Sequence, residues 1–135
     1  MFSSDFWSPS SAATSASIWT ALERCIHVNG VTVDRPQGST HPSYPATAYP
    51  LDYGHIQGTT SGDGAGIDVF VGTTPEPRVT ALAVTFDTDK ADAEVKVLYR
   101  CTDAEIAAVE AFLRPPMPVA AILRRDSPRQ EEDHR

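Results

Sequence analysis

A glycine-rich segment near the middle of the chain gathers the side chains best suited to chemistry. It reads Y-P-L-D-Y-G-H-I-Q-G-T-T-S-G-D-G-A-G-I-D-V, from Tyr49 to Val69. Within it, Asp63 and Asp68 are five residues apart, on a turn that leads into an apolar stretch typical of a strand. The glycines permit a tight backbone, so the two carboxylates can stay close enough to share a cation such as Mg²⁺, which prefers oxygen ligands. Many such turns only cap a strand, and spacing alone leaves that structural role open.

A second acidic group follows on the next predicted hairpin. Its members are Asp87, Asp89, Asp92 and Glu94, and Lys96 lies beside them. If the two hairpins are neighbours in one barrel, their acids converge on a pocket with one ammonium at its rim. Mg²⁺ bound there would polarise phosphoryl oxygens and lower the pKa of a bound water.

Two histidines flank this region of the sequence. His41 precedes the glycine-rich segment, and His55 lies within it. Either imidazole can act as a base near neutral pH, because the usual pKa of histidine is close to that range. A solvent-facing histidine without a role is an equally good interpretation of each.

Hydrophobic periodicity and turn residues predict a small β-rich domain around these residues. A short helix is expected at 16–24, and Asn29-Gly30 between alternating apolar residues favours a two-residue hairpin turn. Residues 36–66 are rich in Pro, Gly, Ser and Thr and predict a long functional loop. Strands are expected at 67–72, 79–86 and 94–99.

The C-terminal part of the chain predicts one substantial helix. Thr102 and Glu105 have the spacing of a capping box. An apolar stripe continues from there to about Leu113, and two prolines then end the helix. Residues 119–123 fit either a last strand or a segment that packs on a neighbour.

Length and composition fit one globular domain. The chain has 135 residues, of which 41% are hydrophobic and 21% are charged, an ordinary globular composition. We expect this domain at residues 16–125, with a mobile charged tail at 126–135. We expect residues 1–15 to form an N-terminal arm that is disordered or docks on a neighbour, because it carries three aromatic side chains.

The charge and the missing apolar segments exclude several classes of protein. The formal net charge is -7, which argues against binding to nucleic acid or to anionic membranes. No run approaches the ~20 apolar residues of a membrane span, and the N-terminus lacks the blocks of a signal peptide, so a cytoplasmic protein is expected. Cys25 and Cys101 have no metal-binding or redox spacing and are expected to be reduced thiols.

The glycine-rich segment resembles the signature region of soluble, family I inorganic pyrophosphatases. That signature reads Y-P-x-x-Y-G-[FY]-I-P-G-T and then D-G-D-P-x-D-V, against Y-P-L-D-Y-G-H-I-Q-G-T and D-G-A-G-I-D-V here. Upstream, V-D-R-P-Q-G-S-T-H-P is similar to the first substrate-side strand of a short subgroup. Downstream, D-T-D-K-A-D-A-E-V-K-V resembles the third acidic cluster of the family. The resemblance covers roughly residues 31–113.

The resemblance implies a mainly β fold, a closed five-stranded barrel of the oligonucleotide-binding type with a C-terminal helix packed outside. It also implies an active site in which Mg²⁺ bridges the protein and pyrophosphate while a metal-activated water attacks phosphorus. The implied metal ligands are Asp63, Asp68, Asp89 and Glu94, the last in place of a family aspartate. The candidate catalytic residues are Tyr53, Asp68, His55 and Lys96. The candidate substrate-binding residues are Asp34, Arg35, His41, Tyr53 and Lys96.

Several positions depart from the family pattern. Ala65 stands where the family has the aspartate thought to accept the proton of the attacking water, and Gly66 replaces the proline that follows. General-base help is typically worth about 10²–10⁴ in rate, so this exchange predicts slow pyrophosphate hydrolysis or none. Residues 36–77 contain no Lys or Arg, which leaves Arg35 and His41 as the nearest replacements for the missing phosphate clamps.

Three functions therefore stand side by side. The first is a Mg²⁺-dependent hydrolase of pyrophosphate or a related phosphoanhydride. The second is a diverged enzyme on the same scaffold that catalyses a non-hydrolytic reaction, as a lyase, cyclase or isomerase, on a small metabolite. The third is a non-catalytic binding or scaffold protein, favoured by the aromatic arm. We expect a small-molecule partner and a homo-oligomer, as is usual for family members of this size.

Overall fold

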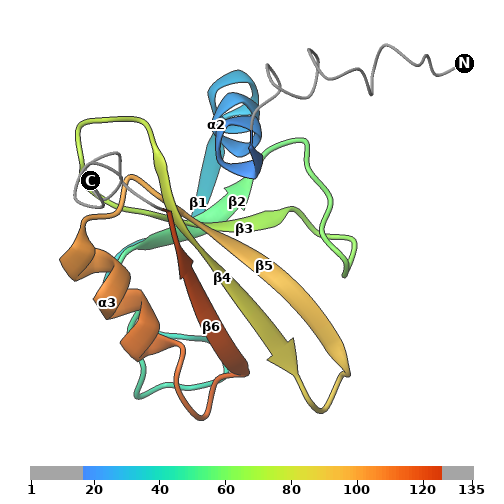
Figure 1. The fold of residues 1–135 in the computed structure, drawn as a ribbon. Coiled ribbons are helices and arrows are strands. Elements are labelled where there is room, and N and C mark those ends of the chain that lie inside the picture. Colours follow the sequence, from blue (N-terminus) through green and yellow to red (C-terminus); the bar gives the residue numbers. More distant parts are fainter. Residues whose placement is uncertain (1–16, 126–135) are drawn as a thin grey trace, which may run out of the picture.

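Six strands form one mixed sheet in the computed structural model, which describes residues 17–125. In their order across the sheet they are β1 (Val31–Arg35), β2 (Asp52–Ile56), β3 (Ile67–Val71), β5 (Asp92–Tyr99), β4 (Val79–Asp87) and β6 (Val119–Arg124). All neighbouring strands pair antiparallel except β3 and β5, which are parallel. The helices of the described fold are α2 (Ile18–Asn29) and α3 (Asp103–Phe112) (Figure 1).

Alternation along the strands divides the apolar side chains between two cores. Successive residues of a strand point to opposite faces of the sheet. Phe70 and Leu98 accordingly belong to the core that includes residues of α3, whereas the preceding residues, Val69 and Val97, belong to the core that includes α2. Tyr53 packs against the first core, so the candidate site lies on the α3 face of the sheet.

Helix α2 is longer than the sequence predicted, and the hairpin expected at Asn29-Gly30 is wrong. The chain stays helical to Asn29, and Gly30 ends the helix with a φ of 84° and an N–H bond to the Ile26 carbonyl of 2.8 Å. Glycine adopts this backbone conformation without steric cost, so an Asn-Gly pair suits helix ends as well as hairpins. Ile26 is buried in the α2 core, and this packing favours the helix.

The C-terminal part of the described chain follows the expectation closely. The Thr102 hydroxyl accepts the Glu105 N–H at 3.1 Å and the Glu105 carboxylate accepts the Thr102 N–H at 2.8 Å, so the capping box is confirmed. The segment at 119–123 is a strand, β6, paired with β4. The three strands expected between residues 67 and 99 are present as β3, β4 and β5.

Strand β2 lies inside the segment that was predicted to be a loop. A Cβ atom on Gly54 would lie 1.8 Å from the Thr32 carbonyl oxygen of β1, so only glycine fits where these two strands meet. The register of β1 shifts at the same place, between Val33 and Arg35. Glycine is depleted from strand interiors, and its presence in a five-residue strand explains why the sequence did not indicate β2.

The mainly β class is confirmed, but the closed five-stranded barrel is not observed. The described residues give a sheet of six strands, with β1 and β6 at its two ends and no pairing between them. Helix α3 packs on one face of this sheet, as the resemblance implied (Figure 1). The arm predicted at 1–15 and the tail at 126–135 lie outside the described residues. The assignment of 16–125 to a single domain stays a prediction.

Two further expectations concern the cysteines and membrane spans. Cys25 and Cys101 are free thiols, as expected. No helix within residues 17–125 is long and apolar enough to cross a membrane.

Candidate active site

Strand register brings an acid and an ammonium face to face on the α3 side of the sheet. Asp68 of β3 pairs with His55 of β2 on one side and with Lys96 of β5 on the other. Residues that pair directly across neighbouring strands point to the same face. An imidazole, a carboxylate and an ammonium therefore lie in one row, although they come from three different strands.

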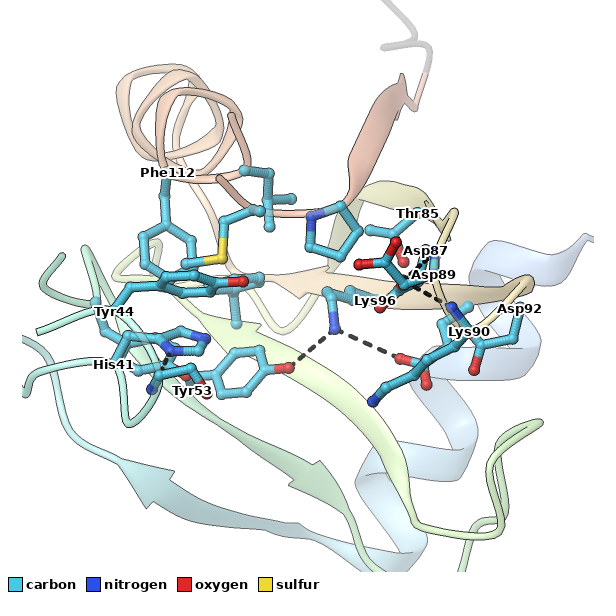
Figure 2. A pocket seen from close by; sticks show the side chains of 17 residues that line it. His41, Tyr44, Tyr53, Thr85, Asp87, Asp89, Lys90, Asp92, Lys96 and Phe112 are labelled. Carbon is cyan, nitrogen blue, oxygen red and sulfur yellow. Dashed lines mark hydrogen bonds and ion pairs between the residues drawn. The ribbon is translucent and has the colours of Figure 1, made fainter. Parts of the chain in front are cut away.

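The ammonium of Lys96 is the centre of the resulting cluster, and Figure 2 shows its bond to Tyr53. Its Nζ donates to Asp68 Oδ2 at 2.8 Å and to the Tyr53 hydroxyl at 3.0 Å, and it lies 3.6 Å from Glu94 Oε1. The Lys96 side chain is only 15% exposed, against 28% for Asp68 and 20% for Glu94. One positive charge thus faces two partly buried carboxylates, and the excess of negative charge favours a further cation.

Tyr53 contributes a hydroxyl group that keeps its proton. Burial raises the pKa of Tyr53 far above its usual range, and the charge of Asp68 and a hydrogen bond with it add to this effect. The phenol therefore stays protonated at any physiological pH. It can donate a hydrogen bond to a phosphate oxygen, but it cannot serve as a base.

Asp63 and Glu94 extend the acidic cluster to the glycine-rich turn. Oδ1 of Asp63 accepts a hydrogen bond from the Ser61 hydroxyl and another from the Ala65 N–H at 3.0 Å. These two bonds are the main reason that the pKa of Asp63 falls to about 2. Burial raises the pKa of Glu94, and its hydrogen bond with Asp63 adds to that rise. The two carboxyl groups are therefore neighbours, with Asp63 held in its ionised form.

His55 is bonded to a carboxylate that the sequence did not connect with it. Its Nδ1 lies 2.8 Å from Oδ2 of Asp34. A Cβ atom on Gly66 would lie 2.9 Å from Cδ2 of the imidazole, so the ring packs over the turn next to Ala65. The three departures from the family pattern, at 55, 65 and 66, are thus neighbours in space.

A pocket of about 450 Å³ opens over Lys96 and Tyr53. The β4–β5 turn forms one end of it with Asp87, Asp89, Lys90 and Asp92 (Figure 2). Asp89 is exposed, and its N–H donates to Asp87 Oδ1 at 2.9 Å. This predicted metal ligand therefore lies at the rim of the pocket and belongs to the turn.

The opposite end of the pocket is aromatic. It is lined by His41, Tyr44, Tyr53 and Phe112 (Figure 2). Burial lowers the pKa of His41, and the charges of Arg35 and Lys96 lower it further, so this imidazole is neutral at pH 7. Arg35 itself lies exposed on β1, opposite Tyr53 in the strand register.

Sequence reasoning missed part of this arrangement. Phe112 was expected in the helix but not as a pocket residue, and nothing in the spacing of Tyr44 indicated a role. Asp34 and His55 are 21 residues apart, and no motif links them. The pairing follows from the β1–β2 register, which could not be expected while β2 was assigned to a loop.

The carboxylates have the right chemistry for Mg²⁺ but do not form a complete protein cage. Residues 17–125 contain no group of three or more acids, histidines or cysteines placed to hold a metal. Mg²⁺ in phosphoryl-transfer sites usually takes one or two carboxylates, with substrate phosphates and waters as its other ligands. Asp68 and Glu94, which both face Lys96, match that smaller set. The donor chemistry of these two carboxylates therefore fits a Mg²⁺ ion.

Comparison with known proteins gives structural likenesses alone. No family model matches the chain, and no curated protein matches its sequence. The inorganic pyrophosphatase of Helicobacter pylori is similar with a TM-score of 0.49 and 12% identity, over 70% of this chain and 80% of that one. The enzyme of Thermus thermophilus has a TM-score of 0.44 and 18% identity, over 70% and 81% of the two chains. The inorganic pyrophosphatase of Coxiella burnetii has a TM-score of 0.40 and 20% identity, over 64% of this chain and 63% of that one. At such low scores and identities these likenesses do not extend to function, which we infer from this chain's own residues.

Proposed function

We propose that this chain is a hydrolase that cleaves a phosphoanhydride, either pyrophosphate or a related compound, with Mg²⁺ shared between protein and substrate. The observation that carries the proposal is the ammonium of Lys96, bonded to Tyr53 and Asp68 beneath a pocket with an acidic rim. An ammonium binds phosphate as a point charge. Carboxylates beside it suit Mg²⁺, which must offset the repulsion between acids and pyrophosphate.

Substrate binding falls to Lys96 and Tyr53 in this proposal. A phosphate oxygen that enters the pocket would compete with Asp68 for the ammonium of Lys96, and the protonated phenol would donate a second hydrogen bond. Arg35 and His41, on the aromatic side, are the further candidates for contact with the substrate. The two side chains lie close together, since the charge of Arg35 lowers the pKa of His41.

Mg²⁺ would be held by Asp68 and Glu94, with Asp63 and Asp89 as outer members of the proposed ligand set. When bound, the metal would supply polarisation of phosphoryl oxygens and a lowered pKa for water. Asp63 is suited to its outer position because the turn keeps its carboxylate ionised.

His55 is proposed to take the proton of the attacking water. If Nδ1–H donates to Asp34, the other ring nitrogen, Nε2, is left with a free lone pair. The water oxygen would bond to phosphorus as the bridging P–O bond breaks, orthophosphate would leave, and the proton would pass to Nε2. The packing of the ring over Gly66, beside Ala65, supports this assignment, since that is where the family has its acid. Asp34, which the resemblance assigned to the substrate side, would then act by orienting the imidazole.

A diverged, non-hydrolytic enzyme is the second candidate, acting as a lyase, cyclase or isomerase. The aromatic end of the pocket favours it, as does the lack of Lys and Arg in residues 36–77. Both features suit an organic metabolite better than a compact, highly charged anion. A non-catalytic scaffold protein would behave differently from either enzyme, because neither Mg²⁺ nor pyrophosphate would stabilise it. A specific ligand at a hundred times its Kd should add about 2.7 kcal/mol to the free energy of unfolding.

The first test measures orthophosphate release from pyrophosphate with and without Mg²⁺. We expect Mg²⁺-dependent release that falls by about a hundredfold or more in Asp68→Asn, because this variant loses a charge at both the metal and the Lys96 ammonium. Asp92→Asn is the matched control, since Asp92 lines the pocket but is outside the proposed ligand set. Release that does not need Mg²⁺, or that falls equally in both variants, would refute the proposal.

Ala65→Asp separates the two enzyme candidates. If native turnover is absent and the substitution creates some, the diverged enzyme is favoured and the scaffold has been retuned. If native turnover is fast, the missing acid has been replaced, which supports a hydrolase with another base.

We also propose that the protein is a cytoplasmic homo-oligomer. Apolar side chains are exposed on the face of β4, β5 and β6 that is turned away from the pocket. They are Val84, Phe86, Val95, Val119 and Leu123, each between 41% and 68% exposed. A cluster of this kind on a soluble domain is typical of an interface, and contact between copies would remove it from water.

A further inference from the structure

The pocket extends well beyond the cluster that cleavage of a phosphoanhydride needs. Its volume of about 450 Å³ lies in the range of about 300–1,000 Å³ that is typical of sites for organic ligands. Lys96 lies between the acidic end and the aromatic end of this pocket (Figure 2). Pyrophosphate bound at Lys96 would therefore leave the aromatic end empty.

The aromatic end has the form of a wall of partly exposed rings. His41 and Tyr44 have centroids 4.8 Å apart, and His41 lies nearly parallel to Tyr49, at 11° and 5.6 Å. Phe112 of α3 closes this wall, with its centroid 5.0 Å from that of Tyr49. His41, Tyr44 and Phe112 are all half-buried and line the pocket. A planar group in the pocket can contact these three side chains and remove their exposed parts from water, as when bases pack on aromatic side chains.

The charged residues of the pocket determine in which orientation a phosphate-containing ligand would bind. Asp87, Asp89 and Asp92 surround the end opposite the aromatic wall and repel an unscreened phosphate, although Lys90 is among them. Lys96 lies between the two ends and bonds to Tyr53, whose ring stacks on Tyr49 at 5.0 Å. Figure 2 shows His41 and Tyr44 on the same side of Lys96 as Tyr53, so a group attached to a phosphate at Lys96 could extend toward these rings.

We infer that the substrate is an organic diphosphate whose other part is a planar aromatic group, as in a nucleoside diphosphate, rather than inorganic pyrophosphate. The phosphates lie at Lys96 and Tyr53, and the planar group lies against His41, Tyr44 and Phe112. This inference rests on the proposed function and names its substrate class. Water adds to the terminal phosphorus, the bridging P–O bond breaks, and the products are orthophosphate and the organic monophosphate.

Binding and turnover are tested separately. Calorimetry in the presence of Mg²⁺ compares methylenediphosphonate with its adenosine ester, adenosine 5′-(α,β-methylene)diphosphate, neither of which can be cleaved at the bridge. We expect the adenosine compound to bind about tenfold tighter or more, the size of one stacking contact. Tyr44→Ala should remove about tenfold of that preference, whereas Tyr44→Phe, which keeps the ring, should retain it. Turnover is then measured as the ratio of kcat/KM for adenosine diphosphate to that for pyrophosphate, and this ratio should fall in Tyr44→Ala alone.

The outcomes separate this inference from the proposed function. Equal affinity for the two analogues, or equal behaviour of Tyr44→Ala and Tyr44→Phe, overturns the inference even if pyrophosphate is hydrolysed. A preference for the adenosine compound that depends on the Tyr44 ring, without any hydrolysis, supports the substrate class and overturns the hydrolase. Failure of both analogues to bind overturns both.

Discussion

Nδ1 of His55 lies 2.8 Å from Oδ2 of Asp34, and the two residues belong to the neighbouring strands β2 and β1. A carboxylate in this position fixes the orientation and the tautomer of the imidazole. In the proposed mechanism, the bond gives His55, a candidate base by its residue type, the fixed orientation that a base beside Asp68 requires. Variants of the two residues can therefore be compared, because a change at His55 removes the imidazole and a change at Asp34 removes only its partner.

His55→Gln should lower kcat for the cleaved phosphoanhydride by about 10²–10⁴, the usual value of general-base help. Asp34→Asn should cost less, about 10–100-fold, because it removes the orienting partner and leaves the ring. Steady-state kinetics across pH 5–9 checks both variants. A change in KM with an unchanged kcat would show that His55 binds substrate instead of taking a proton.

Lys96→Met should weaken the binding of Mg²⁺–pyrophosphate by about 10–100-fold, since it removes a charge-assisted hydrogen bond to phosphate. Lys90→Met is the matched control, because Lys90 lines the same pocket but is exposed at its rim. Equilibrium binding measures both affinities. An equal loss in the two variants would mean that the ammonium of Lys96 acts only through general charge.

Glu105 ties α3 to the end of β3 and should make stability depend on pH. Its carboxylate accepts from the Thr102 N–H at 2.8 Å, the Thr73 N–H at 3.1 Å and the Thr73 hydroxyl at 2.8 Å. Burial alone would raise the pKa of Glu105, but these bonds outweigh it and lower the pKa. The folded state thus binds the proton more weakly than the unfolded state, so the stabilisation is complete above the unfolded pKa, near 4.5. It is lost as pH falls through the lower folded pKa.

Glu105→Gln should therefore lower the free energy of unfolding by about 1.5–3 kcal/mol at pH 7, and by less near pH 3, below the unfolded pKa. Urea unfolding at the two pH values measures this difference. Glu110→Gln, at an exposed position on the same helix, should change stability by less than about 0.5 kcal/mol. A penalty for Glu105→Gln that is the same at both pH values would contradict the assignment of charge-assisted bonds.

Gly54→Ala should destabilise the fold by about 3 kcal/mol or more, because the new methyl group meets the β1 backbone. Gly62→Ala should be nearly neutral, since the nearest atom to its Cβ is the Ala93 carbonyl oxygen at 3.8 Å. Thermal unfolding compares the two variants. A native-like midpoint for Gly54→Ala would show that β1 and β2 can separate at little cost.

Phe86→Asp should shift the proposed oligomer toward monomer, because it places a charge within the exposed apolar face of the sheet. Phe86 is 46% exposed in the single chain, so the substitution should leave the monomer folded. Light scattering over a range of concentrations measures the mass. An unchanged mass would exclude this face as the interface between copies.

The parts of the fold that the sequence predicted correctly carry local signals. The capping box of Thr102 and Glu105 requires only contacts three residues apart, and β4 shows a long apolar run. The errors lie where packing decides between two local options. Asn29-Gly30 suits a hairpin and a helix end equally, and the burial of Ile26 selects the helix. Gly54 argued against a strand, yet its missing side chain is what lets β2 pair with β1.

The sequence predicted which residue types belong to the candidate site, but not which of these residues bond to one another. The acids and Lys96 were marked by spacing and by resemblance to a family signature. The bond of Lys96 to Tyr53 spans 43 residues, and that of Asp34 to His55 spans 21. Both depend on strand register, which no local pattern encodes. The aromatic wall of His41, Tyr44 and Phe112 depends in the same way on the docking of α3.

The residues of the candidate site come from two parts of the chain, which meet where β3 pairs parallel with β5. Tyr53, His55 and Asp68 all precede residues 72–78, the connection between β3 and β4, whereas Glu94 and Lys96 follow it. Each half of the polypeptide thus carries groups that lack their partners: a phenol and carboxylates on one side, the ammonium on the other. If the chain were cut within 72–78, neither piece would contain the whole candidate site. A phosphate ligand that contacts both halves would add one more link between them, beside the pairing of β3 with β5.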